Sequence, residues 1–187
     1  RQTRIPFEVF AFSDAYGKKH RAYGTSAEIN EKYFKTGDLA LNNFKLLNFF
    51  SSNMTISEEM SMMHILWMYA TTSRISPSNL RLGGTPLNDA IIAMMDLVPK
   101  FKKETGVQKV NTIFLPDGAS NGRSGVYDYK FNKEKNTHTK IITEFEHSYF
   151  NKSNIILTDP VMNKTYEIGN MTNDLLRILK NRVPEMN

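Results

Sequence analysis

A glycine-rich turn that opens an amphipathic helix constrains this fold more than any other segment. The turn is Leu82–Leu87 (LGGTPL), and apolar residues then recur at helical spacing from 88 to 98. Pro86 suits the first helical turn, because its missing N–H would have no partner there, and Thr85 is placed to cap the helix. Pro99 predicts that the helix ends or kinks near residue 98.

Two apolar runs flank this helix in the sequence. Val110–Leu115 (VNTIFL) predicts a buried strand that runs directly into an Asp-Gly loop, and Ile5–Phe12 (IPFEVFAF) predicts an earlier buried strand that ends in turn residues. A strand, a helix opened by a glycine-rich turn and a second strand form an α/β pattern. The predicted architecture is therefore a doubly wound, Rossmann-like sheet with helices on both faces.

The intervening segments are less regular. Leu39–Phe50 fits neither period cleanly, so it is either an extended stretch or a short helix. Thr55–Glu58 (TISE) has the pattern of a capping box and predicts a helix that runs to about residue 71. Its methionines recur at helical spacing and are expected to pack in the core, together with His64.

The C-terminal part predicts an insertion and a closing helix. Residues 123–154 are polar and show no clear period, and the next segment resembles a β-hairpin, so we expect an insertion over 123–168. Thr172 is expected to cap a last helix over 173–182. The 187 residues suit a single domain, since no linker is long enough to divide them.

Composition excludes several classes of protein. The sequence has no cysteine, so a disulfide framework, a Cys-ligated zinc and a thiol nucleophile are all ruled out. No uninterrupted apolar run approaches the roughly 20 residues that span a bilayer. We therefore expect a soluble, cytoplasmic protein without membrane partners.

Positive charge is concentrated in one stretch. The whole chain carries a net charge of +5, and residues 100–152 hold ten basic and six acidic residues. Such a stretch could attract an acidic partner or nucleic acid, or it could be an ordinary solvated face.

Two hydroxyl- and carboxylate-bearing residues are predicted to meet at one edge of the sheet. Open α/β sheets bind ligands at the carboxyl ends of their strands, where Thr85 and Asp117 would lie. Their oxygens suit Mg²⁺ or Mn²⁺, and Gly83 and Gly84 let the backbone turn tightly beside them. Gly118 would support the second loop. The alternative is that Thr85 only caps a helix and Asp117 only makes a turn.

Three segments resemble the von Willebrand factor type A (VWA) domain, and the version in cobalt-chelatase-like subunits of large tailed bacteriophages most of all. They are Ile5–Phe12, Gly83–Ala90 (GGTPLNDA) and Ile113–Ala119 (IFLPDGA). The resemblance implies a metal-ion-dependent adhesion site in which Thr85 is the second element and Asp117 the third. The family's first element, Asp-x-Ser-x-Ser, does not occur in this sequence, and Pro116 replaces the usual Thr or Ser.

Two interpretations of the absent element remain open. The chain begins at Arg1, so it could be part of a longer protein whose earlier segment carries the first strand and its serines. Alternatively, the metal site has degenerated. In both cases Thr85 and Asp117 alone would hold an ion weakly, because affinity depends on the number and rigidity of the ligands.

The resemblance implies a non-enzymatic interaction module. A partner's acidic residue would complete the metal's coordination, and the partner would be an AAA+ ATPase of the chelatase class, in the host cytoplasm if the chain is phage-encoded. Asn121 and Arg123, beside the metal loop, are candidate partner-binding residues. The alternative is a basic protein that associates with nucleic acid or the virion and uses the fold as a scaffold. No nucleophile-elbow pattern supports a hydrolase.

Overall fold

The computed structural model describes residues 5–14, 35–41, 44–71, 82–120, 123–133, 136–146 and 155–184. Its strands are β1 (Glu8–Asp14), β2 (Leu39–Ala40), β3 (Phe44–Ser51), β4 (Arg123–Asn132), β5 (Thr137–Glu146), β6 (Ile156–Asp159) and β7 (Lys164–Glu167). Its helices are α1 (Ile56–Thr71), α2 (Leu87–Thr105) and α3 (Met171–Arg182). Helices and strands therefore mix along the chain, as the predicted α/β class requires.

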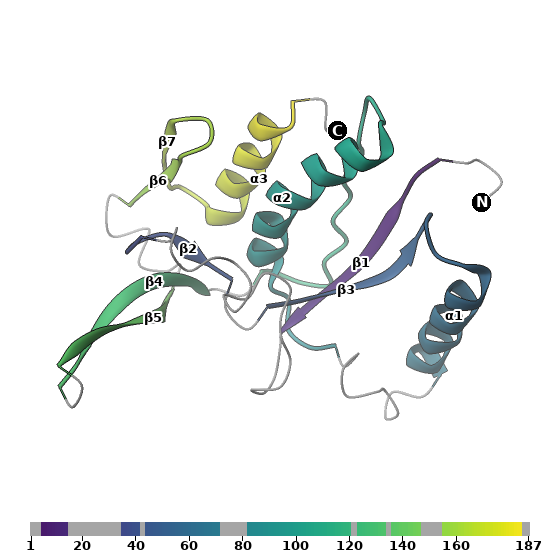
Figure 1. Ribbon diagram of the computed structural model, residues 1–187, viewed down its shortest axis with the longest axis horizontal. Helices are drawn as coiled ribbons and strands as arrows, with labels where there is room; N and C mark the ends of the chain where they lie inside the picture. The colour runs from purple at the N-terminus through teal and green to yellow at the C-terminus, as the bar shows by residue number, and fades with distance from the viewer. Residues whose placement is uncertain are drawn as a thin grey trace.

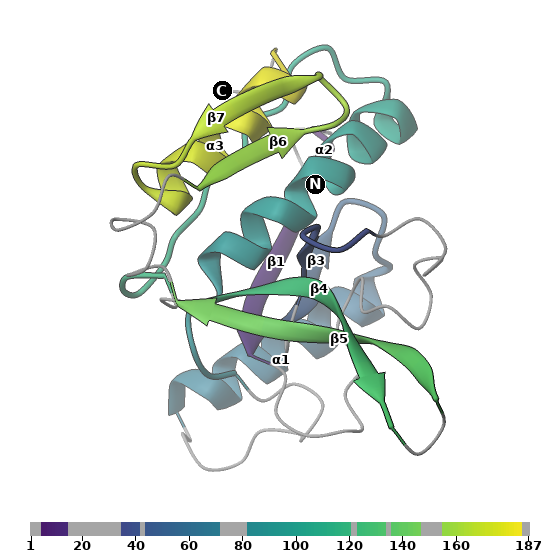
Figure 2. The ribbon, with the colours of Figure 1, turned by 90° about the vertical axis from the view of Figure 1, so that its left-hand side faces the viewer.

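The strands pair as three small antiparallel sheets. β1 pairs with β3, β4 pairs with both β2 and β5, and β6 pairs with β7 (Figures 1 and 2). The strand alternative for Leu39–Phe50 is thus confirmed, and so is the hairpin predicted between 155 and 168. Each of these four strand pairings is antiparallel, and none of them joins the three sheets into one.

Helix α2 organises the core. Its small residues Ala90 and Ala93 are buried against Phe44 of β3, so the helix lies close across the β1–β3 sheet (Figure 1). A second face of α2, including Ile91 and Val98, packs against α3. Burial of apolar surface on two sides of one helix therefore joins the β1–β3 sheet to the C-terminal elements.

The two ends of helix α2 differ from the predicted ones. Pro99 does not end it, because the helix continues to Thr105, with Val98 buried before the proline. Gly106 then ends it in the left-handed conformation (φ 70°) and donates its N–H to the carbonyl of Lys102, as expected of a helix-terminating glycine. Pro86, and not Thr85, occupies the N-cap position, and no side chain caps the helix there.

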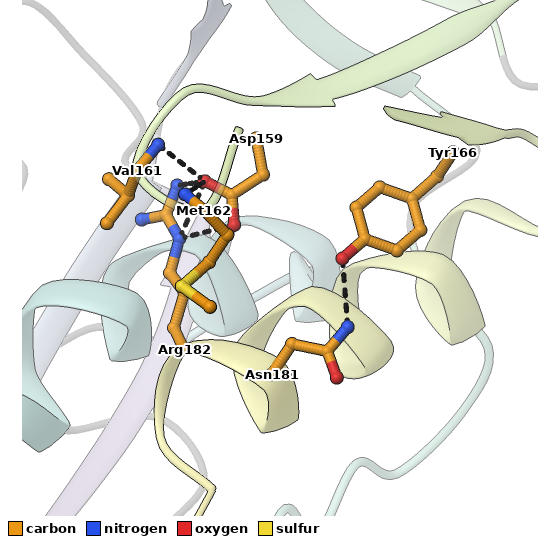
Figure 3. Close-up of polar contacts among 6 residues, drawn as sticks. All are labelled: Asp159, Val161, Met162, Tyr166, Asn181 and Arg182. Atoms are coloured by element: carbon orange, nitrogen blue, oxygen red, sulfur yellow. Dashed lines mark hydrogen bonds and ion pairs between the residues drawn. The ribbon is translucent and has the colours of Figure 1, made fainter. Parts of the chain in front are cut away.

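A buried ion pair anchors α3 to the C-terminal hairpin. Asp159 of β6 is 1% exposed and accepts hydrogen bonds from the Arg182 guanidinium at 2.6–3.1 Å (Figure 3). The backbone N–H groups of Val161 and Met162 also donate to it. Burial favours the neutral form of Asp159, but these hydrogen bonds outweigh it and lower the pKa.

Helix α3 begins at a different residue from the one predicted. Asn170 is the N-cap, and its side chain accepts a hydrogen bond from the N–H of Asn173 at 3.1 Å. The Thr172 hydroxyl instead donates to the Asn88 side chain of α2 at 2.7 Å. An extended residue immediately before the first turn is the position from which a side chain can reach the orphan N–H groups, so Asn170 takes the capping role.

The predicted position of helix α1 is confirmed, but its predicted packing is not. Thr55 and Glu58 form the predicted capping box, with hydrogen bonds of 2.7 Å and 3.3 Å between side chain and backbone. No residue of the helix is buried, however, and Met60, Met63 and Trp67 are each at least 60% exposed. His64 is exposed as well and stacks on Trp67, so the prediction of a packed, methionine-lined core face is wrong.

Three further expectations need correction. Residues 111–115 form no strand, because none of the described strands pairs with them, and Ile113 and Leu115 are 77% and 85% exposed. The first strand begins at Glu8, three residues later than expected, and is only half-buried over most of its length. Conversely, the supposedly irregular segment after residue 123 contains the two ten-residue strands β4 and β5. None of the helices described is both long and apolar enough to cross a membrane.

Candidate functional site

The end of β1 holds the glycine-rich loop in place. Gly83 donates its N–H to the Ser13 hydroxyl at 2.7 Å, and that hydroxyl donates to the Gly83 carbonyl at 2.6 Å. The N–H of Asp14 donates to the same carbonyl at 2.8 Å. Ser13 is fully buried, so this double contact fixes the loop against the strand across 70 positions of sequence.

Gly84 occupies a position where any side chain would have to displace the Asp14 carboxylate. Its φ is +60°, and a Cβ built on it would lie 1.9 Å from Oδ2 of Asp14. The prediction that Gly84 supports the loop thus has a steric basis, because the Asp14 carboxylate lies directly against its backbone. Gly118 has no such constraint, since a Cβ there would meet nothing within 4 Å.

The structure brings the two predicted ligand residues together. The Thr85 hydroxyl donates a hydrogen bond to Oδ1 of Asp117 at 2.9 Å, although the residues are 32 positions apart. A second contact ties the two loops, because the backbone N–H of Asn88 donates to the Ser120 hydroxyl at 3.3 Å. The loop that carries Thr85 and the loop that carries Asp117 therefore contact each other at two places.

The donor set of this pair suits a hard divalent cation. Two oxygens bound side by side in an octahedral Mg²⁺ site, with bonds of about 2.1 Å, lie about 3 Å apart, close to the Thr85–Asp117 separation. Asp117 is exposed and Thr85 half-buried, so ligands from water or a partner can reach them. Over the part of the chain that the structure describes, no three His, Asp or Glu side chains gather closely enough to hold a metal by themselves.

A buried acid lies beside the loop and was not singled out from the sequence. Asp89, in the first turn of α2, is 8% exposed, and its Oδ1 has no hydrogen-bond partner among the described residues. Burial raises its pKa to about 7, and the negative charges of Asp14 and Glu144 add to the effect. In sequence, Asp89 is indistinguishable from an exposed acid that favours a helix N-terminus, so only the fold reveals its burial.

Asp14 was also missed as a candidate. The sequence assigns it to the turn after the first strand, but the structure includes it in β1 and places its carboxylate against Gly84. An acid at the carboxyl end of a strand was the available signal, since ligand sites of open α/β sheets form there. Asp14 adds a negative charge to the loop that carries Thr85.

The structure describes one of the two candidate partner-binding residues. Arg123 is exposed at the start of β4, and its guanidinium lies 3.6 Å from the Glu144 carboxylate of β5. It is therefore accessible but already takes part in an ion pair. Asn121 lies outside the described residues.

No protein-family model, curated protein or solved structure matches this chain.

Proposed function

We propose that this chain is a metal-dependent protein-interaction module of the VWA type. The observation that carries the proposal is the 2.9 Å contact between Thr85 and Asp117. The resemblance assigns these residues to the second and third elements of one metal site, and a shared ion requires their oxygens to lie close together. The ion would be Mg²⁺ or Mn²⁺, held by these two side chains and by water.

The module would work by leaving coordination positions open. Mg²⁺ prefers six oxygen ligands and retains water readily, so a site with two protein oxygens can accept a carboxylate from a partner. Asp14 contributes negative charge close to Thr85, which favours a cation over an anion at this loop. By resemblance, the partner would be a chelatase-class AAA+ ATPase, with this chain as an adaptor and not a catalyst.

Two features support the doubly wound architecture that the VWA resemblance implies. Among the described residues β1 pairs with β3 on one side only, so its other edge is open to a further strand. Residues 110–115 alternate in exposure: Val110 and Phe114 pack on the core, while Ile113 and Leu115 face outward. Such an extended, apolar segment would become a buried parallel strand if another strand lay beside it.

Calorimetric titration with Mg²⁺ and Mn²⁺ tests the metal site. The wild-type chain should bind one ion weakly and saturably, and Thr85→Ala and Asp117→Ala should each abolish the binding heat. Asp96→Ala is the matched control, because it removes an exposed carboxylate from the outer face of α2. Binding that survives in Asp117→Ala, or its absence from the wild type, would contradict the proposal.

A further inference from the structure

The β4–β5 hairpin divides into an anchored base and a projecting end. At the base, β2 pairs with Gly125 and Val126, and Tyr127 is buried at 4% exposure. The backbone of Tyr127 also exchanges hydrogen bonds with Gly37 and Asp38 at 2.9 Å. Beyond this point the two strands continue together away from the rest of the molecule, as both ribbon views show (Figures 1 and 2). We call residues 129–133 and 136–141 the distal arm.

Aromatic side chains lie on one face of the distal arm. Tyr129 and Phe131 are two positions apart in β4, so they share a face, and His138 of β5 is paired with Phe131. Tyr129 and Phe131 are 48% and 47% exposed, and the Phe131 and His138 rings lie 5.2 Å apart. Large aromatic side chains this exposed are available to stack on flat ligands.

Charge is segregated along the same hairpin. In sequence, residues 129–141 hold four lysines and one glutamate, whereas 123–128 and 142–146 together hold one arginine and three acids. Lys130 and Lys133 are exposed in the structure. Among the described side chains, Lys130 and Lys133 therefore place positive charge beside the aromatic face, whereas Asp128 and Glu144 lie nearer the base.

We propose that the distal arm binds single-stranded nucleic acid. Bases would stack on Tyr129 and Phe131, and phosphates would pair with Lys130 and Lys133. Lys130 lies between the two aromatic residues in sequence, so its side chain starts on the opposite face of the hairpin. A two-stranded ribbon is narrow, however, because its strands lie only about 4.8 Å apart. A long lysine side chain can therefore reach a polyanion that crosses the aromatic face. An acidic protein segment would pair with the lysines, but it would supply no bases to stack on the exposed rings of Tyr129 and Phe131.

Fluorescence anisotropy with the full chain tests this proposal. The probes are labelled oligothymidylate and oligouridylate of about 20 nucleotides, compared with a DNA duplex of equal length. Tyr129→Ala/Phe131→Ala should weaken binding to the single strands by about 5-fold or more. Lys130→Ala/Lys133→Ala should make the slope of log K against log salt less negative by about 1.4, because each phosphate contact contributes about 0.7.

Matched controls separate the arm from general surface effects. Trp67→Ala removes an exposed aromatic from α1, and Lys103→Ala/Lys109→Ala removes two exposed lysines from the body; both should bind like the wild type. Phe131→Tyr should retain binding, since it keeps an aromatic ring. No binding by the wild type at low salt would overturn the proposal. So would equal affinity of the aromatic double variant, or a preference for duplex.

Discussion

The buried carboxyl group of Asp89 gives this protein a pH-dependent stability that one substitution should remove. Asp89 is in the first turn of α2 with 8% of its surface exposed, and the charges of Asp14 and Glu144 oppose its ionisation. Its pKa is raised from 3.8 to about 7. Asp89→Asn replaces the carboxyl group with a neutral side chain of the same shape, so the variant avoids the cost of ionising this site.

The size and sign of the effect follow from proton linkage. Between pH 3.8 and about 7 the folded state keeps the proton of Asp89 while the unfolded chain releases it, so rising pH destabilises the wild type. The gap between these pKa values corresponds to a decrease of about 4 kcal/mol in the free energy of unfolding, at about 1.4 kcal/mol per pKa unit. As the pH rises, this loss of stability begins near the pKa of Asp89 in the unfolded chain and is complete above its pKa in the folded protein.

Urea unfolding of wild type and Asp89→Asn, with a chelator present, measures the difference directly. The two proteins should be nearly equal in stability at about pH 4, and the variant should be more stable by about 4 kcal/mol at about pH 8. Asp96→Asn, an exposed position on the same helix, should show no such change with pH. A difference that stays constant with pH, or a variant that is less stable at about pH 8, would refute a protonated buried Asp89.

Two other substitutions have outcomes set by the contacts described above. Asp159→Ala leaves the Arg182 guanidinium without its carboxylate partner, so urea unfolding should show a loss of about 3–5 kcal/mol; a loss below about 1 kcal/mol would mean that the pair contributes little. Gly84→Ala would force a Cβ against Asp14 at positive φ, costing about 1–3 kcal/mol and weakening Mg²⁺ binding. Gly118→Ala, where a Cβ meets nothing within 4 Å, is its control and should change neither stability nor binding.

Local signals were predicted best from the sequence. The capping box at Thr55–Glu58 depends on residues three positions apart, so sequence spacing determines it. The β6–β7 hairpin follows the same logic, since Asp159 accepts hydrogen bonds from the turn residues that follow it. The Thr85–Asp117 contact is long-range, and it was anticipated only because both residues were expected at one edge of a sheet.

Predictions failed where burial or solvation depended on distant parts of the chain. Residues 110–115 are apolar enough for a buried strand, but no described strand pairs with residues 111–115, and Ile113 is exposed. The β4 strand was missed although Tyr127, Tyr129 and Phe131 alternate with polar residues, so a strand signal was present in the sequence. The β5 strand shows no such alternation, because its apolar residues Ile141 and Ile142 are adjacent. To predict the raised pKa of Asp89, one must know where β1 and β5 lie relative to α2.

The metal site and the distal arm can be judged separately because no residue is shared between them. Thr85 and Asp117 lie on the loops before α2 and before β4, whereas Tyr129 and Phe131 lie beyond the anchored base of the hairpin. Asp117→Ala should therefore leave nucleic-acid binding unchanged, and the aromatic double variant should leave Mg²⁺ binding unchanged. If Mg²⁺ altered nucleic-acid affinity in the wild type but not in Asp117→Ala, the base of β4, next to the Asp117 loop, would be the connection between the two functions.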